Sequence, residues 1–187
     1  VYVSFAYDIF AIVDVRDPGS PMIVGELAVA DPGRIALFGD HAIVTRASRD
    51  PLIVDVSNPA APEPVAELAT SGGGVSLSIV GDHAYVASES ALDVVDISDP
   101  LATVLLGSAP LPPPALYAGV TVSGDLVYVS CRDNGLRIYD VSIPDDPRFI
   151  GAAGISGFPY SAQVLGDRLL VNSNGLLYAT PAQCQPQ

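Results

Sequence analysis

A pattern that recurs along the whole chain is the feature that most constrains its fold. The pattern occupies Leu92–Pro100, and its copies are short apolar runs that end in an aspartate. The aspartates of successive copies lie 41, 41 and 44 residues apart. A period of about 40–45 residues that contains several short strand patterns is typical of a β-propeller, in which one repeat forms one four-stranded blade. The four aspartates are Asp14, Asp55, Asp96 and Asp140.

A second landmark keeps the same period. It is a Gly-Asp pair at the end of an apolar run, and successive pairs lie 42, 43 and 42 residues apart. A β-sandwich is the alternative all-β fold, but it does not explain a strict period. The aspartates of these pairs are Asp40, Asp82, Asp125 and Asp167.

Each repeat contains four strand signals. In the third repeat we expect strands at about 75–80, 83–88, 92–97 and 104–107, because apolar and β-branched runs there are separated by Gly, Asp, Ser and Pro. Proline cannot donate to a strand ladder, and Asp and Ser bind nearby backbone amides, so these residues end strands. The predicted fold is therefore an all-β propeller with four-stranded antiparallel blades of about 42 residues.

The repeats divide the chain into three complete and two partial blades. Residue 1 aligns with the start of a second strand, so we expect the chain to be part of a longer protein. We expect an open segment of a larger ring, or a chain that completes its ring by pairing with a copy of itself. Residues 1–30 supply the last three strands of one blade, 31–68, 69–108 and 109–152 are complete blades, 153–180 supply three strands of another, and 181–187 form a tail.

Composition excludes some partners. No uninterrupted apolar run approaches the ~18–20 residues that a transmembrane helix needs, so the 49% of hydrophobic residues are assigned to buried strands. The formal net charge is −13, and the eight basic residues are all arginine. A broad phosphate-binding surface is therefore not expected, and neither is a nucleic-acid partner.

The stretch Leu52–Pro59, LIVDVSNP, together with the Gly-Asp turn, resembles the LVIVD repeat of bacterial and archaeal surface propellers. The resemblance covers about residues 1–180. It implies an extracellular or cell-surface scaffold, and it supplies no catalytic residue. The departures from the pattern are Thr180 in place of the aspartate, the missing second proline after Pro100, and Ala66 where Gly25, Gly107 and Gly151 stand in other repeats.

The first strand of each blade lines the channel of a propeller. Alternation predicts that every second side chain there points into the channel, while the residues between pack against other blades. The predicted channel row contains no carboxylate, histidine or asparagine, whereas propeller hydrolases and lactonases usually hold a central metal with such groups. No metal and no other cofactor is therefore expected, unless missing blades provide ligands. The row consists of Arg34, Ala36, Ser76, Ser78, Gly119, Thr121, Ser161 and Gln163.

One face of the ring is expected to carry the loops before the first strands and the hairpins between second and third strands. We call it the loop-rich face. It gathers half of the arginines and several aromatic residues, and loops on a rigid scaffold often carry recognition. The alternative is that these residues only solvate the face. The candidate ligand-binding residues are Arg34, Arg46, Arg49, Tyr117, Arg132, Asp133, Asn134, Phe158, Tyr160 and Asn172.

The opposite face is expected to be acidic. Calcium binding needs several oxygens at one place, but no Asp-x-Asp-x-Asp-Gly run is present, so turn-forming aspartates are the preferred interpretation. The acidic set is Asp14, Asp17, Asp40, Asp55, Asp82, Asp96, Asp99, Asp125, Asp140, Asp145, Asp146 and Asp167.

Three functions follow from these patterns. The preferred one is a non-catalytic extracellular scaffold that interacts with a protein or a glycan. The alternatives are a structural repeat of a larger secreted protein and a hydrolase-like or lactonase-like propeller. Cys131 and Cys184 are expected at opposite faces, so a disulfide between them is not favoured.

Overall fold

The structure, a computed structural model, is built of β-strands alone in the part of the chain that it describes. That part forms 18 strands in five sheets. No helix in it has the length and apolar character needed to cross a bilayer. The described residues are 2–5, 8–46, 49–88, 90–112, 117–132, 134–155 and 157–181.

The first and last sheets have three strands each, paired in sequence order. We call these sheets the first and fifth blades. The first blade consists of β1 (Tyr2–Phe5), β2 (Ile9–Asp14) and β3 (Met22–Ala28). The fifth consists of β16 (Pro159–Leu165), β17 (Arg168–Ser173) and β18 (Leu176–Pro181).

The three sheets between them have four strands each, also in sequence order and antiparallel. The second blade consists of β4 (Pro32–Phe38), β5 (His41–Arg46), β6 (Arg49–Asp55) and β7 (Glu63–Glu67). The third consists of β8 (Ser76–Val80), β9 (His83–Ala87), β10 (Ala91–Asp96) and β11 (Val104–Pro110). The fourth consists of β12 (Tyr117–Ser123), β13 (Leu126–Cys131), β14 (Gly135–Asp140) and β15 (Arg148–Ala153).

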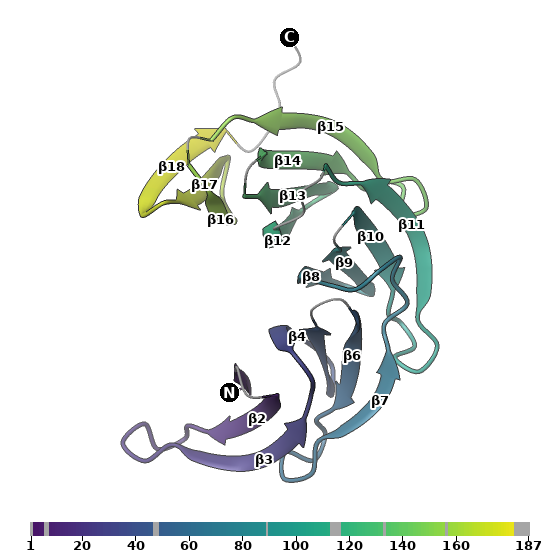
Figure 1. Cartoon of the computed structure of the whole chain (residues 1–187), viewed down its shortest axis with the longest axis vertical. Helices are drawn as coiled ribbons and strands as arrows, with labels where there is room; N and C mark the ends of the chain where they lie inside the picture. Colours follow the sequence, from purple (N-terminus) through teal and green to yellow (C-terminus); the bar gives the residue numbers. More distant parts are fainter. Residues whose placement is uncertain are drawn as a thin grey trace.

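The five blades form an open arc. In Figure 1, β4, β8, β12 and β16 lie along its inner side and β3, β7, β11 and β15 along its outer side. The predicted fold class, a propeller with three complete and two partial blades, is confirmed.

Each of the outer strands β3, β7, β11 and β15 pairs with the preceding strand of its blade, and each pairing contains a β-bulge at the same place. The register shifts at Ile12/Val13, at Ile53/Val54, at Val94/Val95 and at Ile138/Tyr139. A bulge bends its strand and increases its twist. The repeat in sequence is therefore also a repeat of a local distortion of the backbone.

The fifth blade departs from the expected register. In the complete blades the repeat aspartate pairs with the residue after the Gly-Asp turn, but Arg168 pairs with Pro181 instead. The placement of Thr180 at the aspartate position is therefore wrong by one residue. The cause is the tight hairpin at Asn174 and Gly175, whose φ values of +48° and +76° suit a two-residue turn between β17 and β18.

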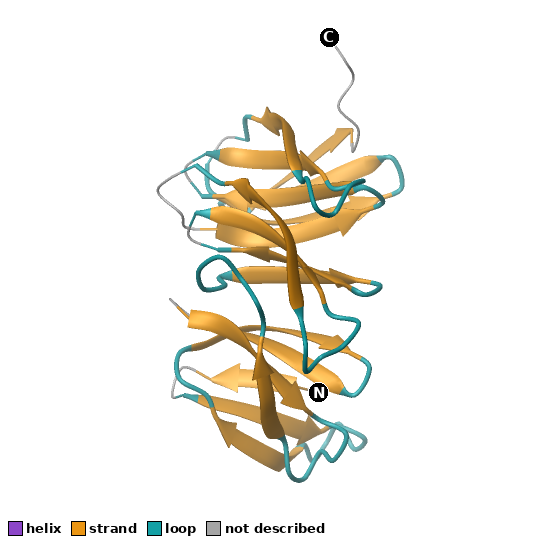
Figure 2. Ribbon diagram, turned by 90° about the vertical axis from the view of Figure 1, so that its right-hand side faces the viewer, coloured by secondary structure: helices purple, strands orange, loops and turns teal. Residues whose placement is uncertain are grey.

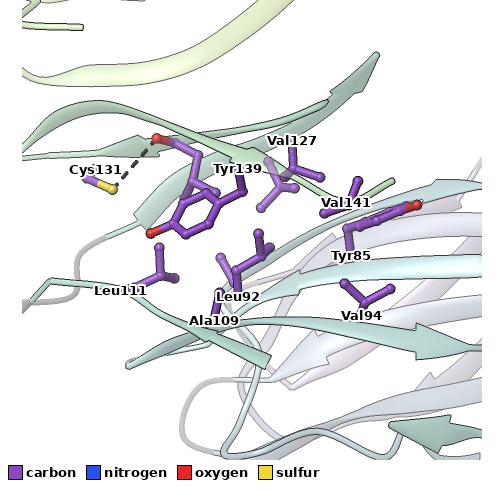
Figure 3. Packing of buried hydrophobic residues seen from close by; sticks show 12 residues of the cluster. Tyr85, Leu92, Val94, Ala109, Leu111, Val127, Cys131, Tyr139 and Val141 are labelled. Atoms are coloured by element: carbon purple, nitrogen blue, oxygen red, sulfur yellow. Dashed lines mark hydrogen bonds between the residues drawn. The ribbon is translucent and has the colours of Figure 1, made fainter. Parts of the chain in front are cut away.

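The hydrophobic core is divided among the joints between neighbouring blades. Figure 3 shows the joint between the third and fourth blades, where Leu92 and Val94 of β10 face Val127 and Tyr139 of the fourth blade. The Tyr139 hydroxyl donates to the backbone oxygen of Pro110 at 3.0 Å, so its polar end is satisfied. Full burial of each such side chain contributes about 1.5–3 kcal/mol, so these joints hold the arc together.

The predicted channel row is wrong, because the sheets stand face to face. Ile35 packs toward the first blade, whereas the next residue, Ala36, packs toward the third. Ser76 is buried, and the Thr121 hydroxyl donates to the backbone oxygen of Ala162 in the fifth blade at 2.7 Å. Alternation along an inner strand therefore separates the two neighbouring blades rather than the channel from the core.

Candidate ligand-binding face

The loop-rich face is one edge of the arc. The antiparallel strand order puts the loops before the first strands at the same end of each sheet as the hairpins between second and third strands. Figure 2 shows the connections gathered on two opposite edges of the arc. The Gly-Asp turns join first to second strands, so they lie on the edge opposite the loop-rich face.

An arginine–aromatic pair bridges the fourth and fifth blades on this face. Arg132 lies in the hairpin between β13 and β14, and its guanidinium carbon is 5.0 Å from the centre of the Phe158 ring. Phe158 precedes β16 and is half-buried, whereas Arg132 is exposed. A cation–π contact at an exposed site contributes about 0.5–1 kcal/mol. The contact therefore orients both side chains while it leaves the guanidinium accessible.

Three further candidates lie close to this pair in the fold. Tyr160, at the start of β16, leaves 48% of its surface exposed. A β-carbon built at Gly119 would be 3.1 Å from the Tyr160 carbonyl oxygen, so the backbones of the two blades meet here. The backbone N–H of Asn134 closes the hairpin by donating to the Cys131 carbonyl oxygen at 3.1 Å, and Asn172 is exposed on β17.

Arg46 does not belong to an exposed surface, so its inclusion as a candidate is corrected. Only 7% of the residue is exposed. Its Nε and Nη2 atoms donate to the Asp50 carbonyl oxygen at 2.8 and 2.5 Å, and Nη2 lies 2.5 Å from Glu67 Oε1. These bonds tie the hairpin between β5 and β6 to β7, which makes Arg46 a structural residue.

Two of the remaining candidates form a second group, and the side chains of the other two lie outside the described part of the structure. Arg34 and Arg49 are exposed on the second blade. The third blade separates them from Arg132, so the structure does not gather all candidate residues in one place. Asp133 and the Tyr117 side chain lie outside the described residues.

A buried carboxylate on β10 was not identified from the sequence. Asp93 is fully buried, and it accepts hydrogen bonds from the Ser71 amide at 2.8 Å and the Ser71 hydroxyl at 2.9 Å. The Ser108 hydroxyl donates to the same carboxylate at 2.6 Å. Its signal in the sequence was an aspartate where the second blade has the apolar Leu52.

The repeat aspartates on the opposite face form turns, as expected. Asp55, Asp96 and Asp140 each accept the backbone amide of the residue two positions later, at 2.8–2.9 Å. These bonds hold the pKa of each carboxyl below its ordinary value. Arg16 lowers the pKa of Asp14 to about 2, chiefly through its side-chain hydrogen bonds. Among the described residues, no three His, Cys, Asp or Glu side chains converge as a metal site would require.

Cys131 is a buried thiol at the end of β13. Burial raises its pKa to about 11, and its sulfur donates a weak hydrogen bond to the Val129 carbonyl at 3.6 Å. The described residues form no disulfide with it, and Cys184 lies outside them. A thiol with a raised pKa is a poor nucleophile.

Comparison with known families gives one specific match. The family model of the LVIVD repeat matches residues 1–29, 31–70, 71–109 and 118–153, which is most of the chain. A comparison with curated proteins finds no match.

Several solved structures share the fold at low sequence identity. A protein from Lactobacillus plantarum is 16% identical with a TM-score of 0.81, over 97% of this chain and 64% of that one. The computationally designed Ika4 protein is 10% identical with a TM-score of 0.65, over 81% and 91% of the two chains. The designed Ika8 protein is 8% identical with a TM-score of 0.64, over 95% and 60%. The chain thus spans less than two thirds of the first and third of these proteins.

Proposed function

The chain belongs to the LVIVD repeat family, and from that premise we propose that it is an extracellular, non-catalytic propeller scaffold whose loop-rich face binds a protein or a glycan. The observation that supports the binding role is the Arg132–Phe158 pair beside the exposed Tyr160. Family membership supports the extracellular location.

The chemistry of this group suits recognition by stacking and by charge-assisted hydrogen bonds. Tyr160 offers an aromatic surface to a sugar ring or to an apolar side chain. Arg132 has five N–H donors in a rigid plane, which bind the carboxylate of a uronic acid or of an acidic side chain. Phe158 holds that plane in place, so the guanidinium loses less freedom on binding.

The test uses two probe sets on the whole chain. One is an array of neutral and uronic-acid-containing oligosaccharides, and the other is a displayed library of folded extracellular protein domains. Against whichever probe binds, Arg132→Ala and Tyr160→Ala are each expected to weaken affinity about tenfold, which is about 1.4 kcal/mol. Arg168→Ala is the matched control, because it removes an exposed arginine beside the Gly-Asp turn on the opposite face.

Three outcomes would contradict the proposal. Absence of any binding would favour a structural repeat of a larger protein. Binding that Arg168→Ala weakens, and that the other two substitutions leave unchanged, would move recognition to the opposite face. Turnover of chromogenic lactones or esters, with and without added calcium, would overturn the non-catalytic assignment in favour of a hydrolase-like propeller.

A further inference from the structure

The outer rim of each of the first three joints is closed by a contact between the outer strand of one blade, β3, β7 or β11, and a loop of the next blade. We call the loop between the third and fourth strands the proline loop. In the second blade it carries Pro59 and Pro62. A β-carbon built at Gly25 of β3 would lie 2.1 Å from the Pro59 carbonyl oxygen and 3.0 Å from Pro62 Cδ. Only glycine permits this approach.

The joint between the third and fourth blades repeats the contact. A β-carbon at Gly107 of β11 would lie 2.5 Å from the Pro144 carbonyl oxygen and 2.6 Å from Pro147 Cδ. Both glycines follow the bulge that their strands share. A glycine on the outer strand therefore pairs with a loop that has two prolines.

The joint between the second and third blades differs in both partners at once. Ala66 replaces the glycine on β7, and Thr103 replaces the second proline of the following loop. The Thr103 hydroxyl accepts the backbone amide of Ala69 at 3.1 Å, so a hydrogen bond stands where the other joints have the proline ring. Both departures from the repeat lie at the same joint, and from this we infer that they are a coupled change.

The proline loop of the first blade has two prolines, Pro18 and Pro21, like the loops that contact a glycine in the other joints. Both prolines are exposed. The loop already has the conformation of its counterparts. The Ser20 amide donates to the Asp17 carbonyl at 3.1 Å and the Gly19 amide to the Asp17 side chain at 3.0 Å, and the second-blade loop has the same two bonds at 3.0 and 3.2 Å. A hollow of about 480 Å³ lies beside this loop, lined by Asp14, Arg16, Asp17, Ser20 and Met22.

The apolar residue before this loop lacks the cover that its counterparts have. Val15 of the first blade is 42% exposed. In the complete blades the equivalent residues are 2–5% exposed, because each packs in the core shared with the blade before it. These equivalents are Val56, Ile97 and Val141.

We propose that the first blade docks a further four-stranded blade of the same repeat, which inserts an outer-strand glycine into the loop of Pro18 and Pro21 and covers Val15. The proposal extends the interface that already joins the other blades. It does not depend on the proposed ligand-binding role of the loop-rich face.

A second copy of this chain is the competing occupant. Its fifth blade exposes Leu165 by 67% and Leu177 by 70%, which offers an apolar face. However, the described part of that blade has no fourth strand, so it brings no outer-strand glycine to the proline loop. A complete blade fills the proline loop and covers Val15. The fifth blade of a second copy would provide only an apolar surface against Val15 and would leave the proline loop empty.

The test adds such a blade from the chain itself. Residues 69–126 are fused ahead of residue 1, which supplies one complete blade with Gly107 and a first strand for the first blade. Val1-Tyr2-Val3 aligns with Val127-Tyr128-Val129, so the fusion keeps the repeat in step. We expect amide exchange in residues 13–22 to slow at least about tenfold relative to the unfused chain, with one unfolding transition at a higher urea concentration.

Variants in the added blade identify the contact. Gly107→Val is expected to abolish the protection of residues 13–22, whereas Ala102→Val, at an exposed loop position of the same added blade, leaves it intact. Gly107→Ala in the added blade combined with Pro21→Thr is expected to restore protection, because it rebuilds the Ala66–Thr103 arrangement.

Three results would overturn the proposal. The first is a fusion in which residues 13–22 exchange as fast as before. The second is protection that persists with Gly107→Val. The third is an unfused chain that sediments as a dimer with Val15 already protected, which would assign the face to a second copy.

Discussion

Ser71 donates both its backbone amide and its hydroxyl to the carboxylate of Asp93, which is fully buried on β10. Ser71 lies in the connection that leads from the second blade into the third. The Ser108 hydroxyl on β11 completes the set of donors. The carboxylate thus ties an interblade connection to the two outer strands of the third blade, and charge-assisted bonds of this kind are stronger than neutral ones.

Asp93→Ala is therefore expected to lower the free energy of unfolding by about 1.5–3 kcal/mol, because it removes the buried carboxylate that accepts hydrogen bonds from Ser71 and Ser108. Urea unfolding followed by circular dichroism measures the loss. Asp99→Ala is the control, since Asp99 is exposed and accepts only local turn bonds. Equal losses in the two variants would contradict a special role for the buried carboxylate.

Gly107→Ala is expected to destabilise the chain by about 1–3 kcal/mol, because its β-carbon would meet backbone atoms of the next proline loop at 2.5–2.7 Å. Gly154→Ala is the matched control, because a β-carbon there would have no neighbour within 4 Å. The control is expected to leave stability unchanged or to raise it slightly. The midpoints of urea unfolding measure both effects, and a tolerated Gly107→Ala would show that the joint relaxes easily.

The fold followed from the sequence because its landmarks are local. Gly39, Gly81, Gly124 and Gly166 all have positive φ, so a turn that requires glycine recurs at each pair. The strands between the turns then follow from alternation and from proline. The blade count needed no information about distant contacts.

The candidate site followed only in part, because it depends on how blades face one another. Arg46 has the same sequence features as Arg49, yet one is buried by the Asp50 carbonyl and Glu67 while the other is exposed. The prediction that one row of inner-strand side chains faces the channel was wrong for the same reason. Alternation separates the two sides of a sheet, but it does not say what covers each side. The Arg132–Phe158 contact likewise joins two blades and has no signature within either repeat.

Stability is expected to fall as the solution becomes acidic. The folded pKa of Asp14 is about 2, below its ordinary 3.8, and hydrogen bonds lower the pKa of Asp55, Asp96 and Asp140 as well. A carboxyl with a lowered folded pKa contributes stability that is fully present above its unfolded pKa and is lost as pH falls through the folded value. The decline should therefore run from about pH 4 toward pH 2.

Unfolding midpoints in urea between pH 6 and pH 2 would show this decline. The triple variant with asparagine at positions 55, 96 and 140 should be less stable at pH 6 and should lose less on acidification, because its turns no longer titrate. A decline as steep as that of the unchanged chain would mean that other carboxyls govern the acid response.

The thiol of Cys131 is expected to be nearly inert in the folded protein. It is 2% exposed, and burial raises its pKa to about 11, so very little thiolate is present at pH 8. In a Cys184→Ser background, alkylation by iodoacetamide should be at least about 100-fold slower in buffer than in denaturing urea, since reaction requires opening of the joint between the third and fourth blades. Because that opening limits the reaction, Gly107→Ala should accelerate labelling, whereas Gly154→Ala should not. Rapid labelling of the unmodified joint would mean that β13 opens locally without separation of the blades.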